Sequence, residues 1–458
     1  MQKKTILLSV FVIVAFYGLV LILQKTATYS KTLSGATIVK TNAKTTINWV
    51  GHWLHEGDRK QLLTGIATEY AFANQDININ LKYPEELYQG SDSLEIRFII
   101  DQIKKPIPDF DIIRIKENYK AIATILNDAY WGEKYLVDFT HIPGFVERHQ
   151  SFINLNDLSS KTGNILVGPY NEGQFWALYV NTDVAQKMGI KVKQYEMTFD
   201  DFLGYIKAVY EYNKSHNTSI TAIFEDHFWI STETIFKHLF YSIIGNYENI
   251  TQSSQLTTQK LDALLQCYKA CEDLSKYQPI SKARTSVVWS KDNCNILNDS
   301  CLFIVNGSWM YNIWSQNDKQ KMKKILPCEL PVFKPIDNYI GGYTSNWAVL
   351  KKSPHCEEAI KLLMYWTTPE IAERWARVTK CPSGVKGNMT TSSFGVEPFE
   401  DFMFTIEKKY GGRKFKEVDV KYILGEKNYR VPLHVIDVLE GKITAQSAFR
   451  DLKSKVIN

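Results

Sequence analysis

The sequence predicts an α/β protein built from parallel sheets with helices on both faces and divided between two lobes. Stretches that alternate apolar and polar residues, as strands do, are separated by stretches with apolar residues at helical spacing. At 458 residues the chain also exceeds a typical single domain, which favours two separate cores. An α/β alternation of this kind places ligands beyond the carboxyl ends of the strands. The loops after the strands are therefore where a functional site is expected.

A first region of strand-helix-strand units begins at residue 45. "TTINWV" and "ININLKY" alternate like strands, whereas "RKQLLTGIATEYAFAN" repeats apolar residues at helical spacing. The same pattern recurs further along the chain. In order, we expect strands at 45–50, 77–83 and 110–115, and helices at 59–74, 91–103 and 119–132.

A second region begins near residue 165 and carries its own alternation to about residue 325. Thr198 followed by Asp200 and Asp201 predicts a capped helix start, because acidic side chains in the first turn interact favourably with the helix dipole. "ITAIF" (220–224) predicts a strand, and residues 227–245 predict a long apolar helix. We find no internal repeat or low-complexity block after residue 45.

The N-terminus carries an apolar run long enough to cross a bilayer. Residues 5–23 contain no charge and follow Lys3 and Lys4, so the chain is expected to be exported with its N-terminus in the cytoplasm. The run is longer than a usual secretory signal, which favours an uncleaved anchor at 1–24 over a cleaved signal segment. Residues 25–45 are polar and predict a stalk. No cysteine lies near the end of the run, which excludes a bacterial lipoprotein anchor.

Composition and motifs exclude several classes of protein. The formal net charge of +5 comes without a basic block, so no nucleic-acid partner is inferred. No nucleophile elbow, phosphate loop or dinucleotide fingerprint is present, and "HWLHE" (52–56) does not match a zinc-protease motif. The seven cysteines lack metal-site spacing and are interpreted as buried or incidental thiols. We therefore predict no cofactor, no metal and no catalytic residue.

Aromatic and polar side chains recur just after the predicted strands. If they share the ligand edge of the sheets, they form a cleft with stacking faces and a few hydrogen-bonding groups, which suits a sugar. The alternative is that these aromatics merely cover the ends of the strands. The clusters contain Trp53, His55 and Glu56; Asn171, Glu172 and Phe175; Asp226, His227, Phe228 and Trp229; and Tyr343 and Trp347.

The stretch "CLFIVNGSWMYNIW" (301–314) reads as a strand, a turn and a helix. Gly307 permits an unusual turn, and Ser308 is expected to cap a helix that begins at Trp309. Taken alone, Trp309 is either a core residue or a flat platform at the mouth of a cleft. The local sequence does not decide between these two interpretations.

Several segments together resemble the extracellular solute-binding proteins of family 1, the sugar receptors of ABC importers. "FIVNGSWMYNIW" is similar to that family's NGSW element, and "FWALYVNTDVAQKMGI" to its "LYYNKDLFEKAGI" segment. "YIGGYTSNWAVLKKSPHCEEAIKLLMYWTTPE" and the tail "VLEGKITAQSAFRDL" resemble two further family elements. The resemblance runs in order over most of residues 46–452. It implies a class II periplasmic-binding-protein fold, with a mainly parallel sheet in each lobe and a ligand cleft between them.

The resemblance also implies the lobe boundaries and a function. The N-terminal lobe would comprise 46–165 and 328–367, and the C-terminal lobe 166–327 and 368–458. The protein would capture a carbohydrate outside the cytoplasmic membrane by hinge closure and deliver it to the permease subunits of an ABC importer. A membrane-tethered sensor and a glycan-active enzyme using Glu56, Glu172 or Asp226 remain alternatives. The implied ligand-binding residues are Trp53, Glu56, Asn118, Asn171, Glu172, Asp226, Phe228, Trp229, Trp309, Tyr343 and Trp347.

Overall fold

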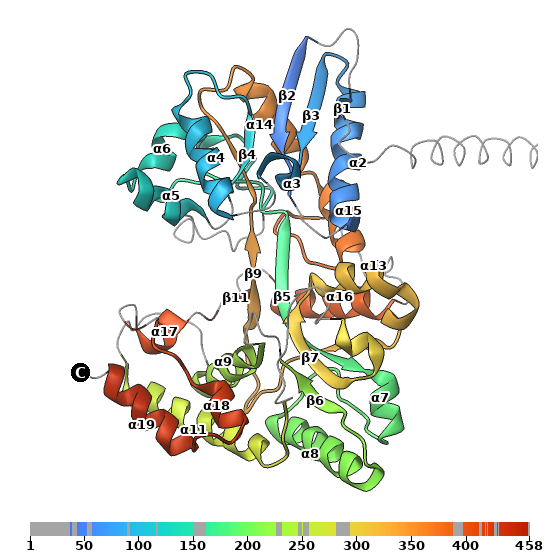
Figure 1. The fold of residues 1–458 in the computed structure, drawn as a ribbon. Helices are drawn as coiled ribbons and strands as arrows, with labels where there is room; N and C mark the ends of the chain where they lie inside the picture. Colours follow the sequence, from blue (N-terminus) through green and yellow to red (C-terminus); the bar gives the residue numbers. More distant parts are fainter. Residues whose placement is uncertain are drawn as a thin grey trace, which may run out of the picture.

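The chain forms two lobes, drawn one above the other in Figure 1 and joined by extended segments. We call the upper one the first lobe and the lower one the second lobe. The computed structural model describes residues 37–38, 44–52, 57–88, 92–115, 118–149, 162–225, 231–245, 250, 256–280, 294–387, 397–411, 415–416, 418, 420–425, 428 and 430–456.

The first lobe contains a 5-stranded sheet with the order β1-β3-β2-β4-β10. Its central strands run parallel, with Thr45 of β2 opposite Ile77 of β3 and Trp49 of β2 opposite Ile112 of β4. The two outer strands, β1 and β10, are antiparallel to their neighbours. The strands are β1 (Thr37–Ile38), β2 (Thr45–Val50), β3 (Ile77–Lys82), β4 (Ile112–Arg114) and β10 (Trp347–Val349).

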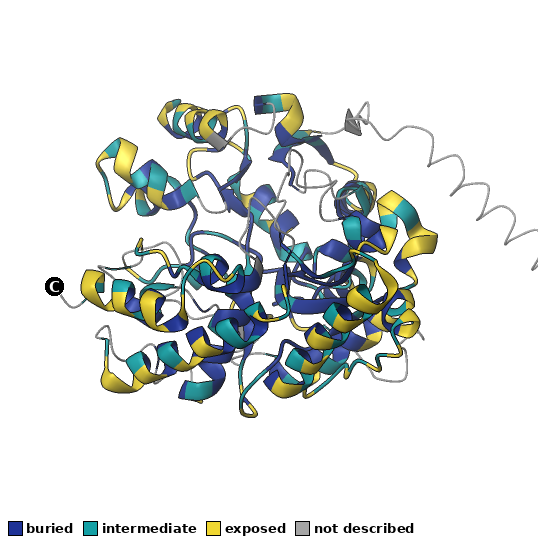
Figure 2. Ribbon diagram, turned by 60° about the horizontal axis from the view of Figure 1, so that its bottom comes forward, coloured by how far each residue is buried: buried dark blue, intermediate teal, exposed yellow. Residues whose placement is uncertain are grey.

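Helices cover the first-lobe sheet and divide its core into two clusters. One cluster lies under α2 and α15 and contains the buried rings of Trp49, Trp347, Trp366 and Trp375, and the other lies under α4 and α5. Buried residues therefore follow the inner faces of these helices, as Figure 2 shows. The helices are α2 (Gly57–Ala73), α3 (Pro84–Tyr88), α4 (Asp92–Lys104), α5 (Tyr119–Leu126), α6 (Trp131–Tyr135), α14 (Cys356–Tyr365) and α15 (Pro369–Thr379).

The second lobe contains a 6-stranded sheet in which β5 runs against all of its neighbours. The strand β5 pairs antiparallel with β7, β8 and β9, whereas β6 with β7 and β11 with β9 are parallel. The expectation of parallel strands is thus correct for the centre of the first lobe and for the outer pairs of the second lobe, whereas β5 is antiparallel to its neighbours because it leads into the second lobe and β9 leads out of it. The strands are β5 (Glu172–Asn181), β6 (Thr221–Phe224), β7 (Cys301–Gly307), β8 (Ile325–Cys328), β9 (Tyr339–Thr344) and β11 (Phe415–Lys416).

A single large apolar core holds the second lobe together. The helix predicted at Thr198 begins there with a capping box, in which Thr198 and Asp201 satisfy each other's backbone amides. The helices are α7 (Thr182–Lys187), α8 (Phe199–His216), α9 (Ser231–Ile244), α11 (Thr258–Ser275), α13 (Met310–Met322), α16 (Pro398–Tyr410), α17 (Val420–Leu424), α18 (Val435–Leu439) and α19 (Ala445–Val456).

One expected helix and both lobe boundaries differ from the sequence-based expectations. The helix expected at 119–132 is two helices, because Asn127 adopts a left-handed conformation that ends α5. Residues 328–336 pack into the second-lobe core through Leu330 and Ile336, although we expected them in the first lobe. Conversely, α15 packs Ile371 and Trp375 into the first-lobe core. The chain therefore returns to the second lobe only after α15.

The predicted anchor at residues 5–23 lies outside the described residues. Within the described ranges, no helix combines the length and the apolar character needed to span a bilayer. All seven cysteines are free thiols, and six are buried, in agreement with the interpretation made from their spacing.

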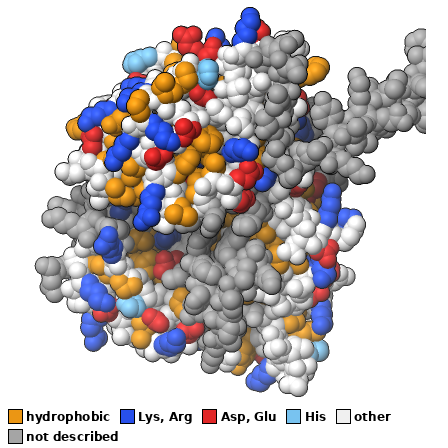
Figure 3. All heavy atoms as spheres, turned by 45° about the horizontal axis from the view of Figure 1, so that its top comes forward, with side chains coloured by type: hydrophobic (Ala, Val, Ile, Leu, Met, Phe, Trp, Pro, Cys, Tyr) orange, Lys and Arg blue, Asp and Glu red, His pale blue; other side chains and the backbone are white. Residues whose placement is uncertain are grey.

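Large exposed apolar side chains are unevenly distributed among the described residues. All of them belong to the first lobe, where Figure 3 shows hydrophobic atoms gathered between lysine and acidic side chains. They are Phe72, Leu94, Ile107, Ile125, Tyr130, Val146 and Val378.

Candidate functional site

Two strands that pass between the lobes form the floor of the candidate site. Residues 172–175 of β5 lie antiparallel to residues 341–344 of β9, with Glu172 opposite Thr344 and Gln174 opposite Gly342. Because side chains alternate along a strand, Gln174 and Trp176 share one face of this ribbon and Phe175 lies on the other. Phe175 is buried in the second-lobe core, whereas Gln174 and Trp176 are half-buried. The face that carries Gln174 and Trp176 is thus the one that remains partly open.

Trp309 stands beside this open face, at the start of α13. Its indole ring lies 5.4 Å from that of Trp176, edge to face, and both rings are half-buried against the second-lobe core. A Cβ atom at Gly307 would lie 2.0 Å from the Trp309 ring, so the ring packs directly on the glycine backbone. Only glycine, which has no Cβ atom, leaves room for the Trp309 ring at this position.

Ser308 does not cap α13, which corrects the sequence-based expectation. The helix begins at Met310 with Trp309 at the N-cap and no side-chain cap bond. Ser308 is instead turned back toward β5: its N–H donates to the Phe175 carbonyl at 2.9 Å, and its Oγ accepts from the Phe175 N–H at 3.4 Å. These two bonds fix the turn that carries Trp309 to the crossing strand.

The open face combines aromatic surface, an amide and free space. A Cβ atom at Gly342, opposite Gln174, would meet no described atom within 4 Å. Trp176 and Trp309 supply apolar rings, and Gln174 supplies a donor and an acceptor. Rings flanked by a few polar groups suit a ligand with C–H faces and hydroxyl groups. We define Gln174, Trp176, Trp309 and the space beside Gly342 as the aromatic platform.

Glu172 is committed to a buried ion pair. Its Oε1 accepts from Arg59 Nη1 at 2.5 Å, and its Oε2 accepts from Asn346 Nδ2 at 2.9 Å. Arg59 is 1% exposed and Glu172 is 8% exposed. Both carboxylate oxygens therefore have protein partners, and Glu172 acts here as a joint between the lobes and not as a free ligand-binding group.

A neutral histidine anchors the segment that leads into β5. His149 Nδ1 donates to the Phe145 carbonyl at 2.6 Å, and its Nε2 accepts from the Tyr170 N–H at 3.1 Å. Burial lowers the pKa of His149 to about 4. The neutral ring can therefore accept the backbone bond that holds Tyr170, next to Asn171.

The other described residues that the sequence predicted as ligand-binding differ in their access to the platform. Asn171 is 1% exposed, and neither of its amide atoms meets a hydrogen-bonding partner among the described residues. Tyr343 is half-buried opposite Gly173, on the face of the ribbon away from Gln174. Asn118 precedes α5 in the first lobe and donates to Glu95 at 2.7 Å. Asn118 is therefore tied into a first-lobe network.

Trp347 is not available to a ligand. Its side chain is fully buried, with ring centroids 4.9 Å from Trp49 and 5.3 Å from Trp366. The prediction that Trp347 lines the cleft is therefore wrong. Trp347 belongs to β10, and its ring packs in the first-lobe core.

Five of the expected binding residues lie outside the described residues: Trp53, Glu56, Asp226, Phe228 and Trp229. Helix α2 begins directly after the first two, and α9 begins shortly after the last three. Among the described residues, no group of His, Cys, Asp and Glu side chains is arranged to hold a metal ion.

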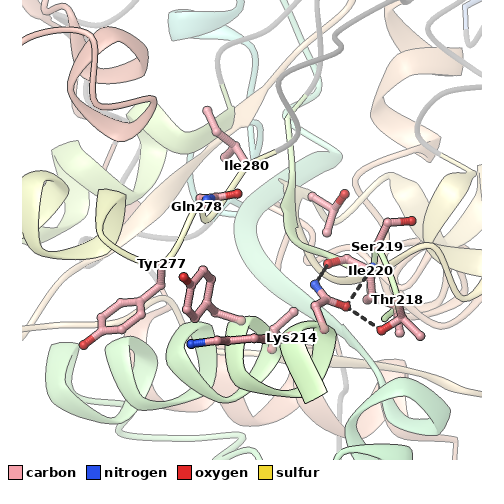
Figure 4. Close-up of a pocket in the computed structure, with 11 residues that line it drawn as sticks. Lys214, Thr218, Ser219, Ile220, Tyr277, Gln278 and Ile280 are labelled. Atoms are coloured by element: carbon pink, nitrogen blue, oxygen red, sulfur yellow. Dashed lines mark hydrogen bonds between the residues drawn. The ribbon is translucent and has the colours of Figure 1, made fainter. Parts of the chain in front are cut away.

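A second concavity lies at the opposite end of the second-lobe strands. It has a volume of about 400 Å³ and is bordered by the end of α8, the start of β6 and the turn after α11 (Figure 4). Asn213 in its wall is already bonded to Thr218 and to both backbone groups of Ile220. The groove adjoins the amino end of β6, whereas parallel strands present ligands at their carboxyl ends. Trp309 follows the carboxyl end of β7, so the platform is the stronger candidate.

Sequence reasoning missed Gln174, Trp176 and Arg59. In "EGQFWALYVN" it selected Phe175, but the paired register turns Phe175 into the core and Trp176 out of it. Alternation along the strand places Gln174 and Trp176 on one face, but it does not determine which of the two faces is buried. Arg59 carried no signal, because a charged residue in the first turn of an amphipathic helix ordinarily faces solvent.

Comparison with known proteins places the chain in a family. The sequence profile of the family described as "Bacterial extracellular solute-binding protein" matches residues 88–389, which is more than half of the chain. No curated protein sequence matches the chain. Solved structures do match over nearly their whole length, at identities that establish the fold alone.

Three of these structures illustrate the likeness. RafE in complex with raffinose is 16% identical, covering 90% of this chain and 98% of that chain with a TM-score of 0.63. Apo RafE from Streptococcus pneumoniae is 15% identical, covering 91% and 99%, with a TM-score of 0.63. The GacH receptor of Streptomyces glaucescens, also solved with acarbose, is 14% identical, covering 90% and 98%, with a TM-score of 0.60. With its two-lobe α/β fold and this profile match, the chain belongs to the bacterial extracellular solute-binding proteins.

Proposed function

We propose that this protein captures a carbohydrate on the aromatic platform and delivers it to an ABC importer. The observation that carries the proposal is the half-buried pair Trp176 and Trp309, beside the Gln174 amide and the space at Gly342. Sugar rings pack their C–H faces on indoles while their hydroxyls bond to amides. The proteins of similar fold include receptors solved with raffinose, stachyose, acarbose and maltose, which supports this ligand class.

Ligand binding raises thermal stability, because a ligand that binds only the folded state stabilises it by RT ln(1 + [L]/Kd). We expect the melting temperature to rise with raffinose, stachyose or maltose at millimolar concentration. Calorimetric titration then gives the affinity of the sugar that produces the largest shift. Peptides and polyamines form the comparison panel. A clear shift with one of these and none with any sugar would contradict the carbohydrate proposal and leave the family assignment untouched.

We further propose that the protein binds its ligand without transforming it. Of the carboxylates considered for catalysis, Glu172 is held by Arg59 and Asn346, so it is not placed to act as a free acid or base. Raffinose is a non-reducing sugar, so hydrolysis of either of its glycosidic bonds would release a reducing sugar that chromatography detects. We expect raffinose to be recovered intact after prolonged incubation, and its steady conversion would contradict the proposal.

The family places this protein outside the cytoplasm, and we propose that residues 5–23 tether it to the membrane there. The retained run should make the protein resist carbonate extraction and leave its N-terminus at or near Met1. A soluble form beginning near Ala27 would instead show that the segment is cleaved. Importer permease genes beside the coding gene would support delivery to an importer, and a lone regulator gene would favour the sensor alternative.

A further inference from the structure

The described chain passes between the lobes at three places that lie close together. It enters β5 at residues 171–173, returns to the first lobe at 344–346 between β9 and β10, and leaves again at 380–382 after α15. Gly173 N–H donates to the Pro382 carbonyl at 2.7 Å, which joins the first crossing to the third. Any change in the angle between the lobes must be absorbed by these segments.

Arg59 reaches two of the crossings at once. Its guanidinium donates through Nη1 to Glu172 in the first crossing at 2.5 Å, and through Nη2 to Cys381 Sγ in the third at 2.9 Å. Through Glu172 it is also linked to the second crossing, because Asn346 Nδ2 donates to the other carboxylate oxygen. The guanidinium carbon lies 5.9 Å from the centre of the Trp375 ring, which holds the head group from the first-lobe side.

The same network continues to the aromatic platform. Cys381 accepts from Arg59 and donates its own S–H to Ser308 Oγ at 3.2 Å. Ser308 is bonded to Phe175 and immediately precedes Trp309. One buried chain of hydrogen bonds thus runs from the first turn of α2 in the first lobe to the turn that carries Trp309 in the second lobe.

Burying the Arg59–Glu172 pair costs desolvation free energy that apolar packing would not. A buried ion pair seldom stabilises a fold more than apolar side chains of equal volume, because both charges lose their hydration. A planar guanidinium, however, donates in two fixed directions, which a lysine or an apolar side chain cannot do. The geometry of Arg59 is therefore suited to fixing the orientation of the segments that it contacts.

We propose that Arg59 is a positioning residue for ligand capture, which fixes the three crossings relative to one another and holds the Trp309 turn in place. Its meaning for capture rests on the proposed function. Its effect on the crossings does not, and can be measured without a ligand. The residue acts through Glu172, Cys381 and Ser308 and need not touch the ligand.

Hydrogen exchange on the full-length protein tests the effect on the crossings. In Arg59→Met, we expect the amides of Gly173 and Ser308 to exchange at least tenfold faster, while amides in β2 and β3 keep their protection. Arg59→Lys, which keeps the charge but not the fork, should fall between Arg59→Met and the native protein. Cys381→Ala is a second variant that removes the thiol's bonds to Arg59 and Ser308 but leaves the Arg59–Glu172 pair in place, and it should accelerate Ser308 exchange. Arg374→Met is the matched control, since Arg374 pairs with Glu69 at 2.6 Å on the surface.

The outcomes separate this inference from the proposed function. Unchanged exchange at Gly173 and Ser308 in Arg59→Met, or a rise equal to that in β2 and β3, would overturn the positioning role. In titrations with raffinose, we expect Arg59→Met to bind at least fivefold more weakly than the Arg374→Met control. Equal affinity in the two variants would overturn the link to capture. If the native protein binds neither raffinose nor any other sugar, the proposed function fails while the exchange result stands.

Discussion

We expect Trp309→Ala to weaken ligand binding more than it weakens folding. A fully buried Trp changed to Ala costs about 3–5 kcal/mol of unfolding free energy. Trp309 is only half-buried, and its edge-to-face contact with Trp176 is of a kind that contributes about 0.5–1.5 kcal/mol. The stability cost should therefore be roughly 1–2 kcal/mol. Loss of a well-placed aromatic anchor should cost about 1–3 kcal/mol of binding, or roughly 5- to 150-fold in Kd.

Trp347→Ala is the matched control, because it removes the same side chain from a fully buried site. Urea unfolding and calorimetric titration with the best sugar of the thermal panel are measured on the same preparations. The control should lose about 3–5 kcal/mol of stability and keep its affinity per folded molecule. Trp309→Ala should instead lose little stability and bind the sugar more weakly.

One specific result would show that Trp309 is not a ligand-binding residue. If Trp309→Ala lost as much stability as Trp347→Ala and bound the sugar as tightly as the native protein, Trp309 would be a core residue. The aromatic platform would then have no functional support. An affinity loss in Trp176→Ala as well would extend the platform to a residue that the sequence did not single out.

Three further predictions concern other parts of the molecule. Gly307→Ala should weaken sugar binding with the Trp309 side chain intact, because the added methyl would lie 2.0 Å from the ring and must displace it; unchanged affinity by titration would contradict the packing described. Burial lowers the folded-state pKa of His149 to about 4 and of His238 to about 3, below the value of about 6.5 in an unfolded chain. Their contribution is therefore complete above pH 6.5 and is lost as the pH falls toward 4, by about 1.4 kcal/mol per pH unit for each ring. Urea unfolding between pH 7.5 and 4.5 should show this slope, and His238→Phe should make it shallower. Lys260→Met should lower the free energy of unfolding by roughly 1–3 kcal/mol, because the buried ammonium donates to the carbonyls of Ile250 and Tyr422. A loss below about 0.5 kcal/mol in urea unfolding, which is the size of an ordinary surface effect, would show that these bonds are dispensable.

Local sequence determined the elements of this protein and much of its family character. The alternation in "TTINWV" and "ININLKY" predicted β2 and β3, and Thr198 with Asp201 predicted the capped start of α8. These features depend on neighbours within a few residues, so they can be derived without the fold. The NGSW turn likewise identified Trp309 as the residue to examine.

Only the tertiary structure decided which side chains meet. Trp347 and Trp309 both follow or begin elements in aromatic-rich sequence, yet one is enclosed by Trp49 and Trp366 and the other stands half-open beside Trp176. Phe175, which the sequence singled out, is buried and Trp176 is half-open, because the register of β5 against β9 selects the face that is buried. Arg59 and Glu172, 113 positions apart, are partners because the start of α2 lies against the start of β5 in the folded chain. Burial, register and long-range charge pairing arise when distant segments pack together, and no local pattern encodes them.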